Sequence, residues 1–337
     1  MEKVLKLLAD GSFHSGEALG SALGISRAAV WKKLKMLEEL GLQLDSVKGK
    51  GYRLHPGVEL LDQQKILDGL DQAVREAVVI QTCLKTASTN DLVRDIHVAS
   101  PAIKGVCLAE YQTSGRGRRG RSWNNPFGST ISMSARWFYS AGMASLEGLS
   151  LAVGLSVVKA LKSCGADNLK LKWPNDVLWQ SSADFQKLSG ILLEVHGDPT
   201  GDCEVIIGIG VNIALSQEQI NDINQPAVDI QRVCGVTVSR NRVASALINE
   251  LCRTLDAFSQ HGFSHFKKQW EQYDAFAGQN VVLDASGNRV SGVASGVNVR
   301  GGLLLKTGEG MMVFNGGEVS LKAGSPGKPL AKKSAEK

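Results

Sequence analysis

The sequence predicts an α+β protein of several domains, and three observations support this. The chain has 337 residues, whereas a single hydrophobic core seldom grows past about 250–300 residues. Its first 54 residues carry short helical patterns that end in a basic hairpin. Helical and strand patterns then mix as far as residue 274, and only short strands with glycine turns follow. We therefore expect folded regions at residues 1–55, 61–274 and 275–322.

Three short helices are expected in the first region. An apolar stripe at residues 4–8 marks the first helix, which Gly11 ends. Ser15 can cap a second helix that runs to residue 23, and Ser26 can cap a third. The third helix carries apolar residues at i, i+4 and i+7, namely Val30, Leu34 and Leu37. Gly20 and Gly24 supply the small residues that a helix-turn-helix needs at its helix crossing and turn.

A basic hairpin follows these helices. Residues 42–47 and 52–54 have strand patterns, and the Lys-Gly-Lys-Gly turn at 48–51 joins them, as in the wing of a winged helix-turn-helix. A basic helix followed by a basic hairpin favours DNA binding over the alternative, a small helical module for protein contacts. The expected DNA-binding residues are Ser26, Arg27, Trp31, Lys32, Lys48 and Lys50.

The remaining elements follow from hydrophobic periodicity and from breaks in it. A His-Pro-Gly break at residues 55–57 predicts a linker. In the middle region we expect strands at 78–82, 106–111, 130–137, 169–173, 190–196 and 205–212, and helices at 89–96, 146–164 and 242–260. In the third region we expect a small barrel with strands at 281–284, 290–299, 302–306, 311–314 and 318–321. Residues 323–337 are expected to be a disordered tail.

Net charge and hydropathy limit the possible functions. The formal net charge is +5, but residues 322–337 hold five lysines and one glutamate and contribute +4 of it. Global charge is therefore no argument for nucleic-acid binding, and only local clusters count. No run reaches the roughly 18 apolar residues of a membrane span, and residues 1–6 lack the order of a signal peptide. We expect a cytoplasmic protein without membrane contact.

Cysteine and histidine spacing gives no indication of a metal site. The six cysteines form no C-x-x-C pair, so a zinc site and a disulfide-linked secreted fold are both disfavoured, and free thiols are expected. The six histidines are scattered. Only His261 and His265 share a helical spacing, and no H-E-x-x-H motif accompanies them.

The most informative segment is residues 115–121, Gly-Arg-Gly-Arg-Arg-Gly-Arg, here named the arginine–glycine loop. It contains G-x-G-x-x-G, but residues 122–128 after it have a loop pattern where a dinucleotide-binding motif needs a helix. Glycines let backbone N–H groups approach an anion, and arginines can bind phosphate with two hydrogen bonds. The segment therefore suits a loop that closes over a phosphate-bearing ligand. A solvated basic loop or an RNA-contacting patch remains the alternative.

Three further strings lie at strand ends, where functional residues gather. The string at 170–176 leaves Asn175 and Asp176 at the end of a strand, and Lys187 stands just ahead of another. A Gly-Ile-Gly-Val-Asn string at 208–212 places glycines that clear room beside Asn212. No P-loop motif is present, which argues against that kind of nucleotide site. Each string alone is more often structural.

Together and in this order, these strings resemble the bifunctional biotin–protein ligases and biotin operon repressors of bacteria. The resemblance covers nearly the full length and rests on Ser-Thr-Asn at 88–90, on 111–121, on Lys-Trp-Pro-Asn-Asp at 172–176, on Lys-Leu-Ser-Gly-Ile at 187–191, on 208–212 and on Gly-Gly-Glu-Val-Ser-Leu at 316–321. The helix-turn-helix separates the bifunctional class from ligases that lack it. The resemblance implies a central mixed sheet flanked by helices and an SH3-like C-terminal domain.

The resemblance also implies a reaction and its partners. Biotin and ATP, with Mg²⁺, would form biotinyl-5′-AMP, and a lysine of a biotin carboxyl carrier protein would then attack this mixed anhydride. With biotinyl-AMP bound, the chain would form a homodimer on operator DNA upstream of biotin synthesis genes. Two rivals remain open: a lipoate–protein ligase, which uses a related fold and chemistry, and a ligand-sensing transcription factor without ligase activity.

The resemblance also implies a role for individual residues, each taken from its position in a matching motif. The biotin-binding residues would be Ser88, Thr89, Asn90, Gln112, Arg116, Gly117, Arg118 and Lys187. The nucleotide-binding residues would be Gly115, Arg118, Arg121, Lys172, Asn175 and Asn212. Arg118, Lys187 and Asp176 would be catalytic, with Asp176 also holding Mg²⁺. The family's adenine-covering segment, which often has a Trp, corresponds to residues 224–227, where no aromatic residue stands.

Overall fold

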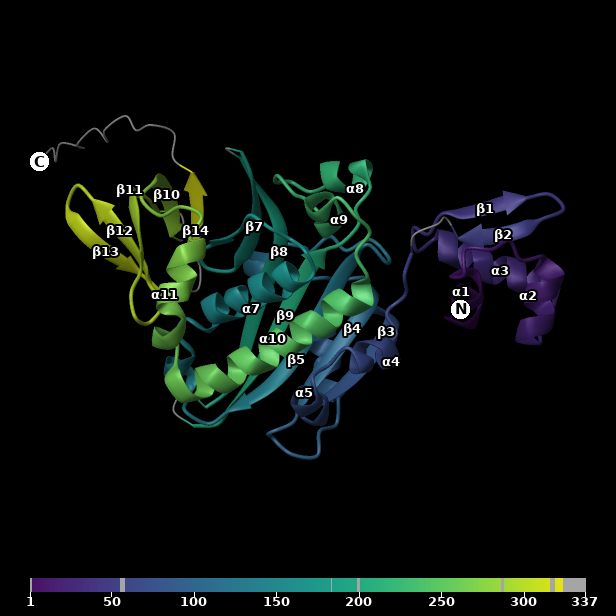
Figure 1. The fold of residues 1–337 in the computed structure, drawn as a ribbon, viewed down its shortest axis with the longest axis horizontal. Coiled ribbons are helices and arrows are strands. Elements are labelled where there is room, and N and C mark those ends of the chain that lie inside the picture. The colour runs from purple at the N-terminus through teal and green to yellow at the C-terminus, as the bar shows by residue number, and fades with distance from the viewer. Residues whose placement is uncertain are drawn as a thin grey trace, which may run out of the picture.

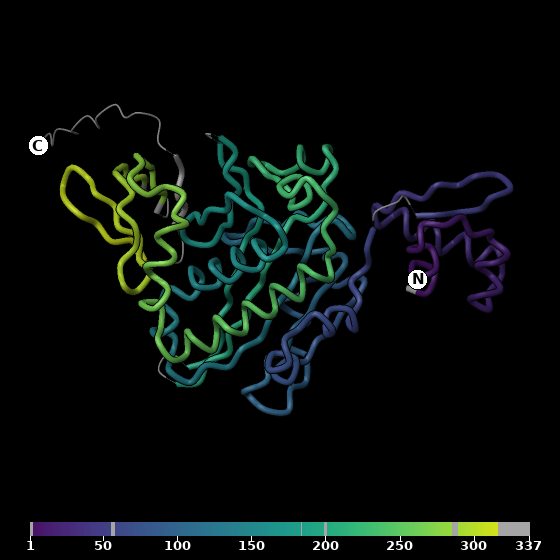
Figure 2. The backbone as a smooth tube through the Cα atoms, viewed as in Figure 1, coloured from purple at the N-terminus to yellow at the C-terminus, as the bar shows by residue number. Residues whose placement is uncertain are grey.

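The structure is a computed structural model, and it describes residues 2–54, 58–182, 184–198, 201–285, 288–315 and 319–323. The predicted linker at 55–57, the Gly-Gly-Glu string at 316–318 and residues 324–337 of the predicted tail lie outside these ranges. Residues 2–54 form a body at one end of the molecule, and the strands from residue 280 onward lie at the other end (Figures 1 and 2). The large sheet region between them carries the candidate site.

The N-terminal body is a helix-turn-helix with a hairpin. Its elements are α1 (Glu2–Leu8), α2 (Gly16–Leu23), α3 (Arg27–Glu38) and the antiparallel strands β1 (Leu44–Val47) and β2 (Gly51–Leu54). Both predicted caps are confirmed: Oγ of Ser15 accepts from Ala18 N at 3.0 Å, and Oγ of Ser26 accepts from Ala29 N at 3.2 Å. A Cβ on Gly20, within α2, would lie 2.8 Å from the Ile25 carbonyl oxygen, so the close approach of the following segment to this helix requires glycine there.

A seven-stranded mixed sheet forms the centre, in the order β3-β4-β5-β9-β8-β7-β6. The strands are β3 (Val78–Thr86), β4 (Lys104–Gln112), β5 (Thr130–Tyr139), β6 (Leu169–Lys172), β7 (Asp176–Ser181), β8 (Asp184–Gly197) and β9 (Cys203–Asn212). Only β3 and β4 pair in parallel; the other neighbours are antiparallel. The predicted strands are confirmed, but β7 was not expected.

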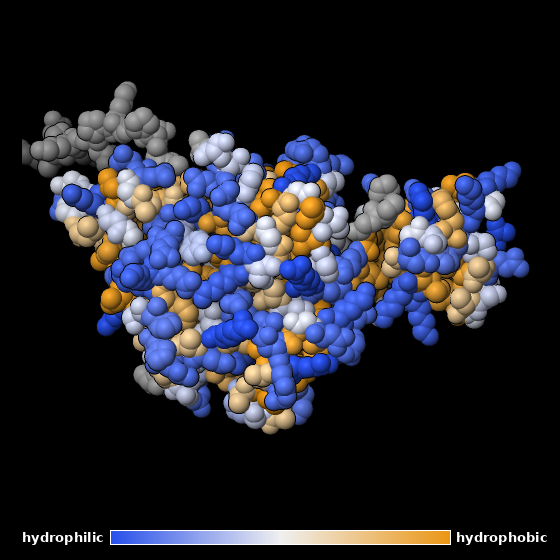
Figure 3. All heavy atoms as spheres, viewed as in Figure 1, coloured by the Kyte–Doolittle hydropathy of each residue, from blue (hydrophilic) through white to orange (hydrophobic). Residues whose placement is uncertain are grey.

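Helices cover the central sheet. They are α4 (Gln63–Asp68), α5 (Gln72–Glu76), α6 (Thr89–Leu92), α7 (Leu149–Ser163), α8 (Gln217–Asn221), α9 (Ile230–Cys234), α10 (Arg240–His261) and α11 (Ser264–Tyr273). The long helices α7 and α10 pack against each other (Figure 1). The side of α10 that faces outward is polar, and Figure 3 shows hydrophilic side chains over most of this face of the molecule.

Residues 143–163, which include α7, are long and apolar enough to span a membrane by length and composition alone. In the fold, 61% of their most apolar window is buried. Because α7 packs against α10 and the central sheet, its apolar character is that of a core helix.

The C-terminal domain is a five-stranded antiparallel sheet in the order β13-β12-β11-β10-β14. Its strands are β10 (Asn280–Ala285), β11 (Asn288–Val297), β12 (Leu303–Thr307), β13 (Gly310–Phe314) and β14 (Val319–Ala323), as the glycine-punctuated pattern predicted. The buried indole N–H of Trp173, just after β6, donates to the Gly301 carbonyl oxygen at 2.9 Å and so links this domain to the central region. Trp173 stands just before the candidate site residues Asn175 and Asp176.

Candidate active site

Two adjoining cavities lie on one face of the central sheet. The first has a volume of about 60 Å³ and the second about 790 Å³. Gly117, Arg118, Trp123, Asn175 and Lys187 line both, so these residues mark the junction. The arginine–glycine loop, which follows β4 in the chain, thus contributes to the walls of both spaces.

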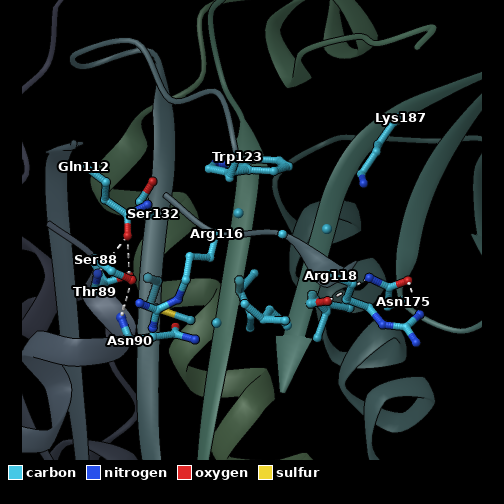
Figure 4. Close-up of a pocket in the computed structure, with 18 residues that line it drawn as sticks. Ser88, Thr89, Asn90, Gln112, Arg116, Arg118, Trp123, Ser132, Asn175 and Lys187 are labelled. Atoms are coloured by element: carbon cyan, nitrogen blue, oxygen red, sulfur yellow. Dashed lines mark hydrogen bonds between the residues drawn. The ribbon is translucent and has the colours of Figure 1, made fainter. Parts of the chain in front are cut away.

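The polar end of the first cavity is built on the start of α6. Thr89 donates twice to Oε1 of Gln112, from its backbone N at 2.7 Å and from Oγ1 at 3.0 Å (Figure 4). Ser134 on β5 donates to Oγ1 of Thr89 at 2.7 Å, and it also lies 2.6 Å from Oδ1 of Asn90. Sheet order, not sequence proximity, brings Ser134 here, and its role was not predicted.

Some polar groups of this cavity remain available. Nδ2 of Asn90 and Oγ of Ser132 are buried and have no hydrogen-bond partner among the described residues. Buried polar groups are normally paired, so unpaired ones in a cavity suit a bound polar ligand. Asn90 offers an amide N–H donor, and the Ser132 hydroxyl can both donate and accept. Together they suit a compact ligand group that carries N–H donors and a carbonyl acceptor.

Two arginines of the loop have different partners. The Arg116 guanidinium forms two hydrogen bonds of 2.8 Å with the carboxylate of Asp91. Arg118 instead donates from Nη1 to Oδ1 of Asn175 at 3.2 Å, as Figure 4 shows. Burial lowers the pKa of the Arg118 guanidinium, with the charge of Asp176 opposing this effect. Arg118 is therefore a partly desolvated cation at the cavity junction.

Trp123 is a site residue that sequence reasoning missed. Its indole lies against the glycines of β8 and β9: a Cβ on Gly210 would come within 2.4 Å of Cε2, and one on Gly190 within 3.4 Å of Cζ3. Nζ of Lys187 lies 5.9 Å from the ring centroid. The indication in the sequence was the Gly-x-Gly pattern of β9. We expected it to clear room beside Asn212, but the space at Gly210 holds Trp123 and that at Gly208 holds Asn90.

Lys187 and Asn212 line the second cavity and bind the backbone of the segment beside it. Nζ of Lys187 forms an ion pair of 2.8 Å with Oδ1 of Asp176. The backbone N of Lys187 donates to the Pro226 carbonyl oxygen at 2.8 Å, and Nδ2 of Asn212 donates to the Val228 carbonyl oxygen at 3.0 Å. The segment at 222–227 is thereby held beside β8 and lines this cavity, together with the indole of Trp123.

The structure brings nearly all predicted ligand-binding residues together. Every residue expected to bind biotin lines the first cavity: Ser88, Thr89, Asn90, Gln112, Arg116, Gly117, Arg118 and Lys187. Most of those expected to bind nucleotide line the second: Arg118, Arg121, Lys172, Asn175 and Asn212. Gly115 lines neither. A Cβ there would lie 2.8 Å from the Trp123 carbonyl oxygen, so Gly115 permits a close backbone contact instead.

The expected DNA-binding residues form a separate surface on the N-terminal body. Arg27, Trp31 and Lys32 are exposed on α3, and Trp31 retains 52% of its accessible surface. Lys48 and Lys50 are exposed in the turn between β1 and β2. Ser26 serves as the N-cap of α3. Because the helix and the turn both present cations to solvent, this body has the charge pattern of a winged helix-turn-helix.

The fold and the site define a class of protein, a ligase that activates a carboxylate and carries a helix-turn-helix. Residues 83–212 match the model of the biotin/lipoate A/B protein ligase family, residues 1–53 that of an HTH domain, and residues 276–322 that of the biotin protein ligase C-terminal domain. The chain belongs to the biotin/lipoate A/B protein ligase family, within the bifunctional ligase/repressors.

Relatives and solved structures agree with this assignment. The chain is 36% identical over 321 residues to the bifunctional ligase/repressor BirA of Escherichia coli, covering 95% of this chain and 97% of that protein. It is 30% identical to the biotin–[acetyl-CoA-carboxylase] ligase of Mycobacterium tuberculosis, over 77% of this chain and 95% of that one. The biotin protein ligase of Aquifex aeolicus in complex with biotin and ATP superposes with a TM-score of 0.61 at 27% identity, covering 73% and 99%.

Proposed function

We propose that this chain is an ATP-dependent biotin–protein ligase that also represses transcription of biotin synthesis genes when biotinyl-5′-AMP is bound. The observation that carries the ligase proposal is the pair of joined cavities with Arg118 and Lys187 at their junction. The first cavity offers buried amide and hydroxyl groups that suit the ureido ring of biotin. The second is larger and lined by cations, as the phosphates of ATP require.

The first chemical step joins biotin to AMP. With its ring in the first cavity, biotin would direct its carboxylate toward Lys187, and a carboxylate oxygen would attack the α-phosphorus of ATP. The bond to pyrophosphate breaks, and the lysine ammonium and the Arg118 guanidinium offset the negative charge on the transferring phosphoryl group. Preorganised cations in a partly buried site stabilise such a transition state better than water does.

Magnesium fits the second cavity as a partner of the nucleotide. Asp176 and Asp222 line this cavity, and no cluster of three or more acids, histidines or cysteines occurs among the described residues. Mg²⁺ is commonly held by one or two carboxylates together with substrate phosphates, so Asp176 would suffice as its main protein ligand. Bound in this way, the ion would neutralise phosphate charge.

In the second step a lysine amine of the biotin carboxyl carrier protein attacks the carbonyl carbon of biotinyl-AMP, and AMP leaves. The chain's role in this step is to hold the anhydride away from water until the acceptor arrives, which the arginine–glycine loop can do by covering the junction. Trp123 offers an apolar face between the two cavities.

ATP–pyrophosphate exchange tests the ligase proposal against its rivals. Exchange that needs both biotin and Mg²⁺ supports it. Equal exchange with lipoate would favour a lipoate–protein ligase, and no exchange with either acid would leave a ligand sensor without ligase activity. Transfer of labelled biotin to a purified carrier domain then tests the second step.

For repression, we propose residues 1–55 as the DNA-binding unit, 61–274 as the catalytic domain and 275–322 as the C-terminal domain. A lone winged helix with so few cations binds DNA weakly at physiological salt, so a homodimer would be needed to double the contacts. Arg27, Trp31 and Lys32 would meet the major groove, and Lys48 and Lys50 the phosphates. A gel shift with the chain's own biotin-synthesis promoter should require biotin plus ATP and should vanish when residues 1–54 are deleted.

The cytoplasm is the proposed compartment. ATP, the carrier protein and chromosomal DNA are all available there. The cysteines are free thiols, which suits a reducing environment.

A further inference from the structure

Arg116 connects three separate elements at the edge of the first cavity. It starts from the arginine–glycine loop, and both of its terminal nitrogens bond the Asp91 carboxylate on α6 at 2.8 Å. Its Nη2 also lies 3.2 Å from Oε1 of Glu194 on β8. Figure 4 shows Arg116 between the group formed by Ser88, Thr89 and Asn90 and the junction residue Arg118.

The guanidinium of Arg116 is therefore matched by carboxylates of the protein itself. The hydrogen bonds that Arg116 donates to Asp91 lower the pKa of the Asp91 carboxyl and raise the pKa of the Arg116 guanidinium. Arg94 forms a second ion pair with Glu194, at 3.4 Å, and contacts His196. Arg116 therefore joins the arginine–glycine loop to α6 and β8 through carboxylates of the protein.

We infer that Asp91 and Glu194 are positioning residues: they hold the arginine–glycine loop over the first cavity through Arg116 and so set how fast biotinyl-AMP escapes. This inference rests on the proposed ligase function. Gly117 and Arg118, the next residues along the loop, line both cavities. Backbone hydrogen bonds close the loop on itself, from Gly117 N to the Arg121 carbonyl oxygen at 2.7 Å and from Trp123 N to the Gly115 carbonyl oxygen at 2.9 Å. The Arg116 side chain ties this closed loop to α6 and β8, so its partners help to set where Gly117 and Arg118 lie.

The size of the effect follows from exposure. Side-chain accessibility is 38% for Arg116, 51% for Asp91 and 24% for Glu194. Exposed ion pairs contribute little each, so losing one carboxylate should speed escape of the adenylate by roughly two- to fivefold. Losing both should speed it about tenfold, because Arg116 then keeps no partner on α6 or β8. The pairs are screened by salt, which distinguishes them from apolar packing.

The test uses the full chain loaded with biotinyl-AMP made from labelled biotin and ATP. After a chase with unlabelled biotin and ATP, release of the label is followed over time in Asp91→Asn, Glu194→Gln and the double variant. Asp68→Asn is the matched control, because Asp68 forms an exposed pair with Arg75 at 3.4 Å on α4 and α5. Release should be faster in the first three and unchanged in the control. Raising salt should speed release in wild type and far less in the double variant.

Equal release rates in wild type and the double variant, with the same salt dependence, would overturn the inference. Amide hydrogen exchange of residues 115–121 in the unloaded chain supplies a second measurement that needs no adenylate. Exchange there should be faster in Asp91→Asn and Glu194→Gln than in wild type and Asp68→Asn. Equal exchange would also count against a role of the two acids in holding the loop. A wild type that forms no adenylate would refute the ligase proposal, while hydrogen exchange would still decide on the loop. Asp91 lies on α6 and Glu194 on β8. If one single variant fails to fold, the other therefore still tests the inference.

Discussion

Replacing Gly210 by alanine should move Trp123 and impair the site without harming the fold. The new Cβ would lie 2.4 Å from Cε2, 2.5 Å from Cζ2 and 2.9 Å from Nε1 of the indole, whereas ordinary contact begins at 3.4 Å. The ring must therefore shift by about 1 Å, since overlapping atoms repel steeply. Gly210 does not have a positive φ, so its backbone accepts alanine without strain.

Two opposing contributions set the magnitude. Overpacking typically costs about 1–3 kcal/mol, whereas replacing glycine by alanine at a compatible backbone position gains about 0.4–1 kcal/mol. The net change in the free energy of unfolding should therefore be small. Catalysis is more sensitive, because a shift of about 1 Å in a group that lines both cavities can lower the rate about 100-fold.

The assay is biotin-dependent ATP–pyrophosphate exchange, with thermal unfolding and indole fluorescence as structural measurements. Gly105→Ala is the matched control: it lies on β4, its φ is not positive, and the added Cβ meets Ile96 at an ordinary 3.5 Å. Gly210→Ala should lose about 100-fold in kcat/KM while Gly105→Ala keeps wild-type activity. In a Trp123→Ala background, Gly210→Ala should have little further effect. Equal activity of Gly210→Ala and Gly105→Ala would refute this placement of Trp123.

Three further predictions concern charged residues. Arg118→Gly should release biotinyl-AMP faster, because the variant lacks the hydrogen bond to Asn175 and a cation at the junction. Release is measured as biotin attached to bystander lysines, and unchanged retention of the adenylate would contradict this prediction. Lys187→Ala should slow adenylation about 30- to 1000-fold, the effect of losing about 2–4 kcal/mol of transition-state stabilisation; a wild-type exchange rate would remove Lys187 from the site. Arg240→Met should lower the free energy of unfolding by about 3–5 kcal/mol, because Glu110 is 2% exposed and would be left as a buried charge without its counter-ion. A denaturant midpoint equal to that of wild type would refute this prediction.

Local patterns predicted most of the fold because local physics determines it. The caps at Ser15 and Ser26 follow from hydroxyl oxygens placed before apolar periodicity, and the central strands follow from apolar runs. The strand β7 was missed because Pro-Asn-Asp at 174–176 has the pattern of a stop. In the structure, Asp176 pairs with Lys172 across a tight hairpin and with Gly190 of the neighbouring strand β8.

The candidate site was predictable only where its residues stand in recognisable strings. Trp123, Ser134 and the acids Asp91 and Glu194 escaped, because each matters through a partner far along the chain. Their contacts depend on strand order and register, which a single sequence does not reveal. The glycines of β9 illustrate this point: the sequence indicates that space is needed, but only the sheet shows that Trp123 occupies the space at Gly210.

The buried pair of Arg240 and Glu110 limits how ligand binding can influence DNA binding. Nη1 of Arg240 donates to Glu110 Oε2 and to the Glu59 carbonyl oxygen, both at 2.6 Å, and Leu61 N donates to Glu110 Oε1 at 2.5 Å. The segment that follows the helix-turn-helix is thus anchored to β4, two residues before Gln112. Breaking a buried ion pair costs about 3–5 kcal/mol, which exceeds a typical allosteric coupling free energy of about 1–3 kcal/mol. Rearranging this anchor would consume more free energy than the coupling supplies. We therefore expect this anchor to stay intact with and without ligand. In the proposed repressor, the ligand would then act through the exposed arginine–glycine loop, on the affinity between the subunits of the proposed homodimer.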